Sequence, residues 1–453
     1  MKEGQMIEQG KPLLIIDVSP LWELQYTGIS NVVFELTKRF LSDIKSDFSI
    51  KFSVFWKIID VSIIEMCLQN RSGFELQMAF QKNEGITEIA VDQYGQIDGC
   101  YSYGLFLHRK PNKKVFHKDS QLFYDFSFLL TQECHTRDTV NFHLEGLIEQ
   151  IASTDLFFCI SESTASDLQW LFNVPKEKTV VALLGHNVDT EMALKAREQI
   201  GDREIEPYFI MLGTIEPRKN IAIMFEWFKK NPNLLKKFRF VFAGRGGWGP
   251  SFMDYVTKYG LSSSVESGRI VYLGYVDEAL KATLIVGARA IFYPSIFEGF
   301  GLPVLEAMEL GVPVIASCST SIPEVLGDTG YYFDPYSVES LDKAFSAFLF
   351  DQYTERLDVL RENAKKRASE FSYDRTYSVI SNSLRLKFLD NEITEQESST
   401  NSASVNCVDI STHIEQPCQP TLVLVEGTHA LTKPPSQVPS SKKAKHKKRQ
   451  KRR

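Results

Sequence analysis

Long apolar segments are missing from this sequence of 453 residues. No hydrophobic run approaches the roughly 18–20 residues that a helix needs to cross a bilayer, so we expect no transmembrane helix. The seven cysteines are scattered and form no Cys-x-x-Cys pair, which argues against a disulfide framework and indicates reduced thiols. Residues 1–11 are polar and lead directly into a predicted strand, so we expect no signal peptide. These absences together predict a cytoplasmic protein.

Acidic residues are absent from the last stretch, Lys442–Arg453, which contains nine lysines and arginines. Because the whole chain has a net charge of −6, residues 1–441 carry −15. From residue 391 onward Ser, Thr, Gln, Glu and Pro dominate and aromatic residues are scarce. Such a composition cannot bury enough apolar surface to fold, so residues 391–453 are predicted to be a disordered tail.

The basic end of this tail has three interpretations. It could simply keep the protein soluble. It could instead bind an anionic membrane surface at the inner leaflet, where each Lys or Arg contributes about 1 kcal/mol. Contact with nucleic acid is disfavoured, because no aromatic side chain is interleaved with the charges.

The length and composition fit two globular domains. A chain of this size exceeds one ordinary hydrophobic core, and 43% hydrophobic with 24% charged residues is typical of globular proteins. Strand and helix patterns alternate regularly between residues 208 and 334, which predicts a doubly wound parallel sheet. The run at residues 13–18, apolar except for Asp17, predicts the first strand of a second such sheet. The predicted fold class is therefore α/β.

A glycine-bearing turn near residue 300 is the first candidate site. It joins a predicted strand at residues 290–293 to a predicted helix at residues 302–310. Gly299 and Gly301 lie in the turn, which would present bare amides and the positive end of the helix dipole. These features suit a phosphate group.

Two carboxylates accompany this turn. Glu298 lies within it, and Glu306 projects from an apolar helix face, where a carboxylate needs a partner. An anion site with two carboxylates beside it fits a ligand that has both phosphates and sugar hydroxyls, such as a nucleotide sugar. An ordinary glycine turn with solvated carboxylates is the alternative.

A pair of cations forms the second candidate site. Arg218 and Lys219 follow a predicted strand at residues 208–213 and precede a predicted helix from residue 221, with Asn220 as its cap. Cations at a helix start add to the positive end of the dipole, which is unfavourable for the helix but favourable for binding a diphosphate. We therefore predict that this pair binds an anion.

The segment Gly244-Arg-Gly-Gly-Trp-Gly249 matches Gly-x-Gly-x-x-Gly, the fingerprint of dinucleotide binding. That fingerprint requires a helix to open within the glycine turn. Pro250 and Ser251 postpone the helix here, so we reject a dinucleotide site. We expect a tight turn at the ligand cleft, with Arg245 adding a cation.

The donor-side motifs resemble a known family. Glu298-Gly-Phe-Gly-Leu-Pro-x-Leu-Glu-Ala-Met, followed by Gly311-Val-Pro-Val-Ile-Ala-Ser and Ile322-Pro-Glu-Val-x-Gly, looks like the donor-site signature of family 4 glycosyltransferases. The resemblance implies a GT-B fold of two facing Rossmann-like domains and transfer with retention of anomeric configuration. The chain has no Asp-x-Asp, the metal-carrying motif of the other major transferase fold. We therefore expect no metal and no cofactor besides the nucleotide-sugar co-substrate.

The resemblance also implies roles for individual residues. Glu298, Arg218 and Lys219 would be catalytic: the two cations would neutralise the departing diphosphate, and Glu298 would hold a hydroxyl of the donor sugar. Glu306 would accept hydrogen bonds from the ribose hydroxyls. The other residues expected to contact the donor are Gly299, Phe300, Gly301, Leu302, Gly28, Asp125, Tyr124, Gly244, Arg245 and Val276.

The first half of the chain departs from the family pattern in two places. Relatives often continue Thr-Gly-Ile with Gly-Arg, whereas Ser30-Asn31 follows here. Relatives commonly carry His-Asp where this chain has Tyr124-Asp125, so Tyr124 is either a ligand contact or plain core. His135 is the alternative replacement for the missing histidine.

The resemblance predicts four parts. They are an acceptor-side domain at residues 1–200, a nucleotide-sugar domain at 201–372, a helix at 373–390 that returns to the first domain, and the tail. Residues 196–207 would be the interdomain linker. The predicted function is transfer of a hexose, mannose being favoured, to a glycan or lipid-linked acceptor in surface polysaccharide synthesis. A sugar-nucleotide epimerase of the same fold and a non-catalytic nucleotide-sugar-binding or scaffold protein are the alternatives.

Overall fold

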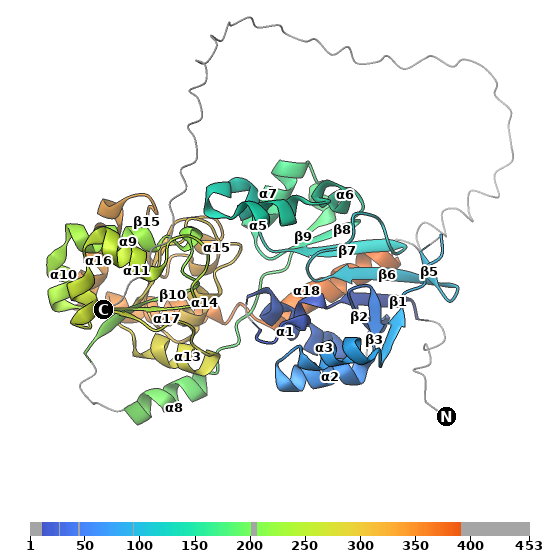
Figure 1. Ribbon diagram of the computed structural model, residues 1–453, viewed down its shortest axis with the longest axis horizontal. Helices are drawn as coiled ribbons and strands as arrows, with labels where there is room; N and C mark the ends of the chain where they lie inside the picture. Colours follow the sequence, from blue (N-terminus) through green and yellow to red (C-terminus); the bar gives the residue numbers. More distant parts are fainter. Residues whose placement is uncertain (1–10, 27, 44–45, 94, 201–205, 391–453) are drawn as a thin grey trace, which may run out of the picture. The chain divides into compact units, whose positions relative to one another are not determined.

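The computed structural model describes residues 11–26, 28–43, 46–93, 95–200 and 206–390. Two β-sheets and the helices that pack on them make up this part of the chain (Figure 1). We call the first sheet with its helices the first domain and the second sheet with its helices the second domain. The tail predicted for residues 391–453 lies outside the described residues.

The first sheet has nine strands in the order β4-β3-β2-β1-β6-β7-β8-β9, and β5 pairs with β6. The pairs from β2 through β1, β6, β7 and β8 to β9 are parallel, as predicted. Strands β3 and β4 extend the edge in antiparallel pairs, which the sequence did not indicate. The strands are β1 Leu13–Asp17, β2 Ser49–Val54, β3 Lys57–Ile59, β4 Ile86–Glu88, β5 Gln96–Ile97, β6 Cys100–Phe106, β7 Lys118–Phe123, β8 Leu156–Cys159 and β9 Thr179–Val181.

The second sheet has six strands, all parallel, in the order β12-β11-β10-β13-β14-β15. The order runs outward in both directions from the adjacent strands β10 and β13, which is the doubly wound arrangement. The strands are β10 Tyr208–Leu212, β11 Arg239–Ala243, β12 Ile270–Tyr272, β13 Ile291–Tyr293, β14 Val314–Ser317 and β15 Tyr331–Phe333.

Helices connect the strands of both sheets. Those of the first domain include α1 Ile29–Ser42, α2 Val61–Asn70, α3 Phe74–Lys82, α4 Ser127–Leu130, α5 Arg137–Leu144, α6 Leu147–Ala152 and α7 Glu162–Phe172. Those of the second domain include α9 Ile221–Lys230, α10 Pro232–Lys237, α11 Phe252–Tyr259, α12 Ser262–Glu266, α13 Glu278–Gly287, α14 Leu302–Glu309, α15 Ile322–Leu326, α16 Val338–Asp351 and α17 Arg356–Ala368.

Strand β10 shows why the central strands read as continuous apolar runs. Successive side chains of a strand point to opposite faces of the sheet. Ile210 and Leu212 belong to one hydrophobic core, whereas Phe209 and Met211 belong to another. Because both faces are covered by helices, every position must be apolar.

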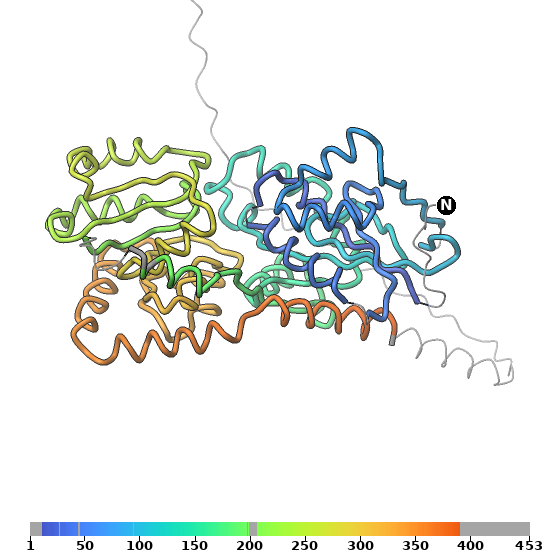
Figure 2. Tube along the Cα trace, turned by 90° about the horizontal axis from the view of Figure 1, so that it is seen from below, coloured from blue at the N-terminus to red at the C-terminus, as the bar shows by residue number. Residues whose placement is uncertain are grey.

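The last helix, α18 Tyr373–Leu384, continues into a helical turn at Arg385–Asp390 and packs against α1 of the first domain. Figure 2 shows this orange segment running from the second domain along the first. Arg39 of α1 pairs with Asp374 at 2.6 Å, and Tyr377 hydrogen-bonds to Asp43. These contacts agree with the predicted returning helix, although the residue boundaries of the domains stay predictions.

Two local expectations were wrong. The polar stretch predicted as a linker at 196–207 begins inside a helix, α8 Thr190–Ile200, which packs against α13. Asn220 precedes α9 but its side chain does not cap that helix. Its side-chain amide instead donates to the backbone carbonyls of Pro294 and Pro335. These bonds link the turn that carries Arg218 and Lys219 to two neighbouring loops.

The described helices do not include a membrane span. Each of them is too short or too polar to cross a bilayer, within the ranges that the structure describes.

Candidate functional site

The turn between β13 and α14 places Glu298 in a buried position, where 6% of the residue is exposed. Gly301 precedes α14 with φ of 106°, a conformation that favours glycine. The hydroxyls of Thr320 and Ser321 donate to the Glu298 carbonyl at 2.8 and 2.9 Å. The turn is therefore held rigidly by its own neighbours.

The Glu298 carboxylate joins both predicted cations. It accepts from Lys219 Nζ at 2.7 Å and from Arg218 Nη1 at 3.1 Å. Burial alone would raise the pKa of Glu298, but the charges of Lys219 and Arg218 outweigh it and lower the pKa to about 2. Glu298 is therefore ionised at neutral pH.

Arg218 is held by further partners. Burial acts to lower its pKa, but the nearby carboxylates, Glu298 foremost, raise it further above its usual range. The guanidinium donates to Glu216 at 2.9 Å and to the Phe297 carbonyl at 2.8 Å. Its plane is thus fixed before any ligand arrives.

Glu306 has the partner that its position on an apolar face demanded. Its Oε1 accepts from Lys281 Nζ at 2.7 Å, while the buried Oε2 has no hydrogen-bond partner. Burial raises the pKa of Glu306, and the charge of Lys281 opposes that rise. An oxygen without a partner is free to accept from a ligand hydroxyl.

One cavity of about 580 Å³ gathers these groups from both domains. Every residue predicted to be catalytic or to contact the donor lines it. They are Gly28, Tyr124, Asp125, Arg218, Lys219, Gly244, Arg245, Val276, Glu298, Gly299, Phe300, Gly301, Leu302 and Glu306.

Two of these glycines are required by close approach of the backbone. A Cβ on Gly244 would lie 1.9 Å from the Gly213 carbonyl oxygen. A Cβ on Gly299 would lie 2.2 Å from the carbonyl oxygen of Tyr124, which belongs to the first domain. A side chain on Gly244 would push apart the loops that follow β10 and β11, and one on Gly299 would push the second domain away from the first.

The departures in the first domain have structural partners. The Tyr124 hydroxyl donates to the Leu107 carbonyl at 2.8 Å, so it is engaged by the backbone although its ring lines the cavity. Asp125 accepts from the backbone and the hydroxyl of Ser127, at 2.9 and 2.6 Å. Asn31 lines the cavity and accepts from Arg71.

Several cavity residues were not predicted. Lys281 lies on α13, three residues after Glu278, and pairs with both Glu278 and Glu306. The spacing on the helix was visible in the sequence, but the pairing with Glu306 depends on how α13 packs. Tyr293, at the end of β13, contacts Lys219 Nζ at 3.3 Å through its hydroxyl. His135 lines an adjoining cavity and not this one.

Comparison with known proteins identifies the family. The family model described as "Glycosyl transferases group 1" matches residues 193–367. O-antigen chain mannosyltransferase B of Escherichia coli is 30% identical over 292 residues, which cover 63% of this chain and 75% of that protein. The chain belongs to the group 1 glycosyl transferases.

Solved structures of other glycosyltransferases share the fold of this family member. Sucrose-phosphate synthase of Thermosynechococcus elongatus superposes with a TM-score of 0.56 at 15% identity, over 87% of this chain and all of that one. HepE of Anabaena, solved with UDP and glucose, gives 0.54 at 15% identity, over 83% of this chain and 99% of that one. The predicted GT-B fold is thus confirmed, as is the prediction of a glycosyltransferase.

We predict that replacement of Glu298 by glutamine changes the pH dependence of folding. A carboxylate whose pKa is lower in the folded state stabilises that state above its unfolded pKa, and the effect is lost as pH falls through the folded pKa. At pH 7 Glu298→Gln should lower the free energy of unfolding by about 3 kcal/mol. The difference from wild type should shrink between about pH 5 and about pH 2, as measured by urea unfolding. A difference that stays constant over this range would show that Glu298 is not held ionised.

Proposed function

We propose that this glycosyltransferase is a retaining, family 4 enzyme that moves a hexose, mannose being favoured, from a nucleotide-diphosphate sugar to a glycan or lipid-linked acceptor. The observation that carries the proposal is the convergence of Arg218, Lys219 and Glu298 with the Gly299–Leu302 turn on one cavity. Cations and bare amides together suit a diphosphate, which needs charge and hydrogen bonds at once. Placement in surface polysaccharide synthesis is supported by the name of the E. coli relative, an O-antigen chain mannosyltransferase.

The diphosphate lies, in this proposal, between the two cations and the amides at the start of α14. The ribose then extends toward Glu306, whose Oε2 has no partner and can accept from a hydroxyl. The base reaches the turn at Gly244 and Val276, beside the Arg245 side chain, which lies 5.7 Å from the centroid of the Tyr275 ring. The sugar faces Glu298 and the first domain.

The chemistry we propose is front-face displacement. The acceptor hydroxyl oxygen bonds to the anomeric carbon as the bond from that carbon to the β-phosphate oxygen breaks. The electron pair of the broken bond stays on the diphosphate, which takes the acceptor proton. Arg218, Lys219 and the amides stabilise the charge that forms on the leaving group. In this scheme no metal ion is needed, because the protein supplies the positive charge.

We also propose that the protein is cytoplasmic and associates with the inner face of the membrane through Lys442–Arg453. This proposal is supported by the sequence alone, in which residues 442–453 contain nine lysines and arginines. Binding to vesicles that contain phosphatidylserine should fall sharply with added salt, because the attraction is electrostatic. A chain ending at residue 441 should not sediment with these vesicles. Equal sedimentation of the two chains would contradict this localisation.

Single substitutions in the cavity test the site. We expect Lys219→Ala and Glu306→Ala each to lower the rate of transfer by about 10²-fold or more, the effect of losing one preorganised electrostatic contact. Lys230→Ala and Glu226→Ala, which remove an exposed ion pair on α9, are the matched controls and should transfer normally. Near-normal turnover in Lys219→Ala or Glu306→Ala would refute the assignment of the site.

A panel of donors tests the function. We expect one of GDP-, UDP-, ADP- or dTDP-sugars, with GDP-mannose favoured, to raise the melting temperature of the full chain by several degrees. Ligand at 100 times its Kd contributes about 2.7 kcal/mol to the folded state. Incubation of the bound donor without acceptor should leave the sugar unepimerised. Conversion of the donor alone would favour an epimerase, and donor binding with no transfer to any acceptor would favour a binding protein.

A further inference from the structure

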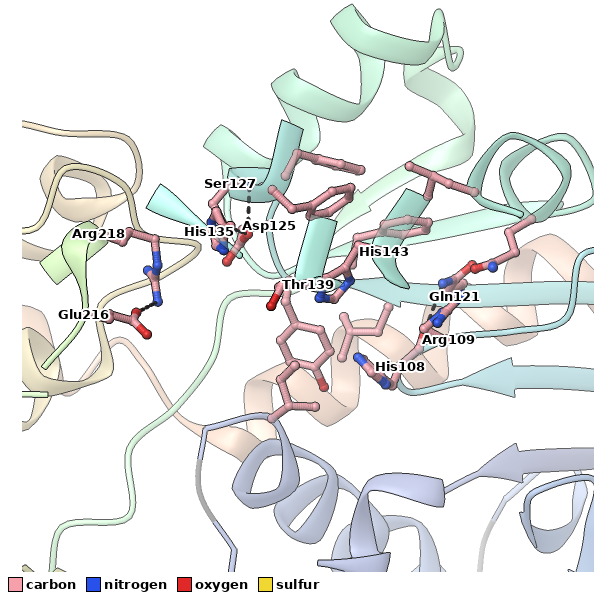
Figure 3. Close-up of a pocket in the computed structure, with 18 of the residues that line it drawn as sticks. His108, Arg109, Gln121, Asp125, Ser127, His135, Thr139, His143, Glu216 and Arg218 are labelled. Atoms are coloured by element: carbon pink, nitrogen blue, oxygen red, sulfur yellow. Dashed lines mark hydrogen bonds and ion pairs between the residues drawn. The ribbon is translucent and has the colours of Figure 1, made fainter. Parts of the chain in front are cut away.

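A second cavity, of about 340 Å³, adjoins the one just described. Its residues come mostly from the end of β7 and from the segment that follows it (Figure 3). The two cavities adjoin along five residues that line both of them, which are Ile29, Tyr124, Asp125, Glu216 and Arg218.

Both domains contribute to this second cavity. Figure 3 shows Arg218 and Glu216 of the second domain facing Asp125 and His135 of the first. The Trp248 ring of the second domain lies nearly parallel to the His135 ring, with centroids 6.3 Å apart. The cavity is therefore complete only when the two domains are together, as a transfer site requires.

Two buried polar atoms of this cavity have no hydrogen-bond partner. Gln121 is 3% exposed, and its amide nitrogen donates to the His108 carbonyl at 2.9 Å, which leaves Oε1 unused. His135 Nε2 is likewise buried without a partner. Buried polar groups normally have partners, so a pair of unused ones in one cavity points to a ligand that supplies them.

The charges of the cavity favour a neutral ligand. Burial lowers the pKa of His108 to about 4 and also lowers the pKa of His135 and His143, so all three imidazoles are neutral at pH 7. The guanidinium of Arg218 is already paired with Glu216 and Glu298. Arg109 and Arg218 line the cavity together with the carboxylates of Asp125 and Glu216, so the charges of its ionised side chains cancel. Neutral imidazoles and a carboxylate instead suit hydroxyl groups, which both donate and accept.

We propose that this cavity binds the terminal sugar of the acceptor, that this sugar is an uncharged hexose, and that Gln121 and His135 select it by hydrogen bonds. The inference rests on the proposed function, because it assigns the second substrate of the same reaction. The shared wall at Asp125 and Arg218 brings a hydroxyl of this hexose beside the anomeric carbon of the donor.

Saturation-transfer NMR on the full chain tests the proposal with methyl α-D-mannopyranoside as the neutral probe and mannose 6-phosphate as the anionic one. Each titration is run with and without the nucleoside diphosphate that binds best. We expect the neutral glycoside to bind, and Gln121→Leu and His135→Ala each to weaken it by about tenfold. His117→Ala is the matched control, since His117 lines neither cavity, and it should bind as wild type does.

The outcomes separate this proposal from the assignment of the donor site. The nucleotide should raise the melting temperature of Gln121→Leu and His135→Ala by as much as it raises that of wild type. This result will show that both variants are folded. Glycoside binding that is absent from wild type, unchanged in both variants, or weaker than that of mannose 6-phosphate would overturn the proposal. Failure of wild type to bind any nucleotide would instead overturn the proposed function, while the titration without nucleotide would still decide whether the cavity takes a hexose.

Discussion

The buried carboxylate of Glu298, bonded to both Arg218 and Lys219, is the interaction on which the site depends. Two cations cannot lie side by side in a largely buried turn unless an anion balances them. Glu298 supplies that anion in the free protein and fixes the positions of both side chains. Because the cations are already placed, a diphosphate bound there as proposed would meet a prepared environment, and little reorganisation would be needed when charge develops on it.

Close backbone contacts explain why this arrangement needs glycine. Gly299 follows Glu298 directly, and its α-carbon approaches the Tyr124 carbonyl of the first domain so closely that a Cβ would lie 2.2 Å away. The turn that contains Gly299 is therefore a point where the two domains meet. Gly299 thus places the Glu298 turn of the second domain against Tyr124, which lines both cavities together with Asp125.

The sequence indicated which residues would gather at the larger cavity but not the partners around them, for a physical reason. Parallel strands place the loops at their carboxyl ends along one edge, so the polar residues after β10, β11 and β13 had to converge. Partners that depend on helix packing were not predictable: Lys281 reaches Glu306 only because α13 lies against α14. The second cavity was missed because its unused atoms, in Gln121 and His135, become recognisable only when every neighbouring hydrogen bond is known.

Besides the apolar packing of α18 on the first domain, the domains are joined by a polar contact. Glu324, in the Ile-Pro-Glu-Val motif of α15, accepts from the backbone amides of Glu162 and Ser163 at 2.7 and 2.6 Å, at the start of α7 in the first domain. A carboxylate at a helix start is stabilised by the dipole and by unpaired amides, which water can also satisfy when the contact separates. A large apolar interface would resist opening, because it would expose its surface to water. A polar contact of this kind can separate at little cost, so it would not oppose the closing and opening of domains that transfer between two substrates requires.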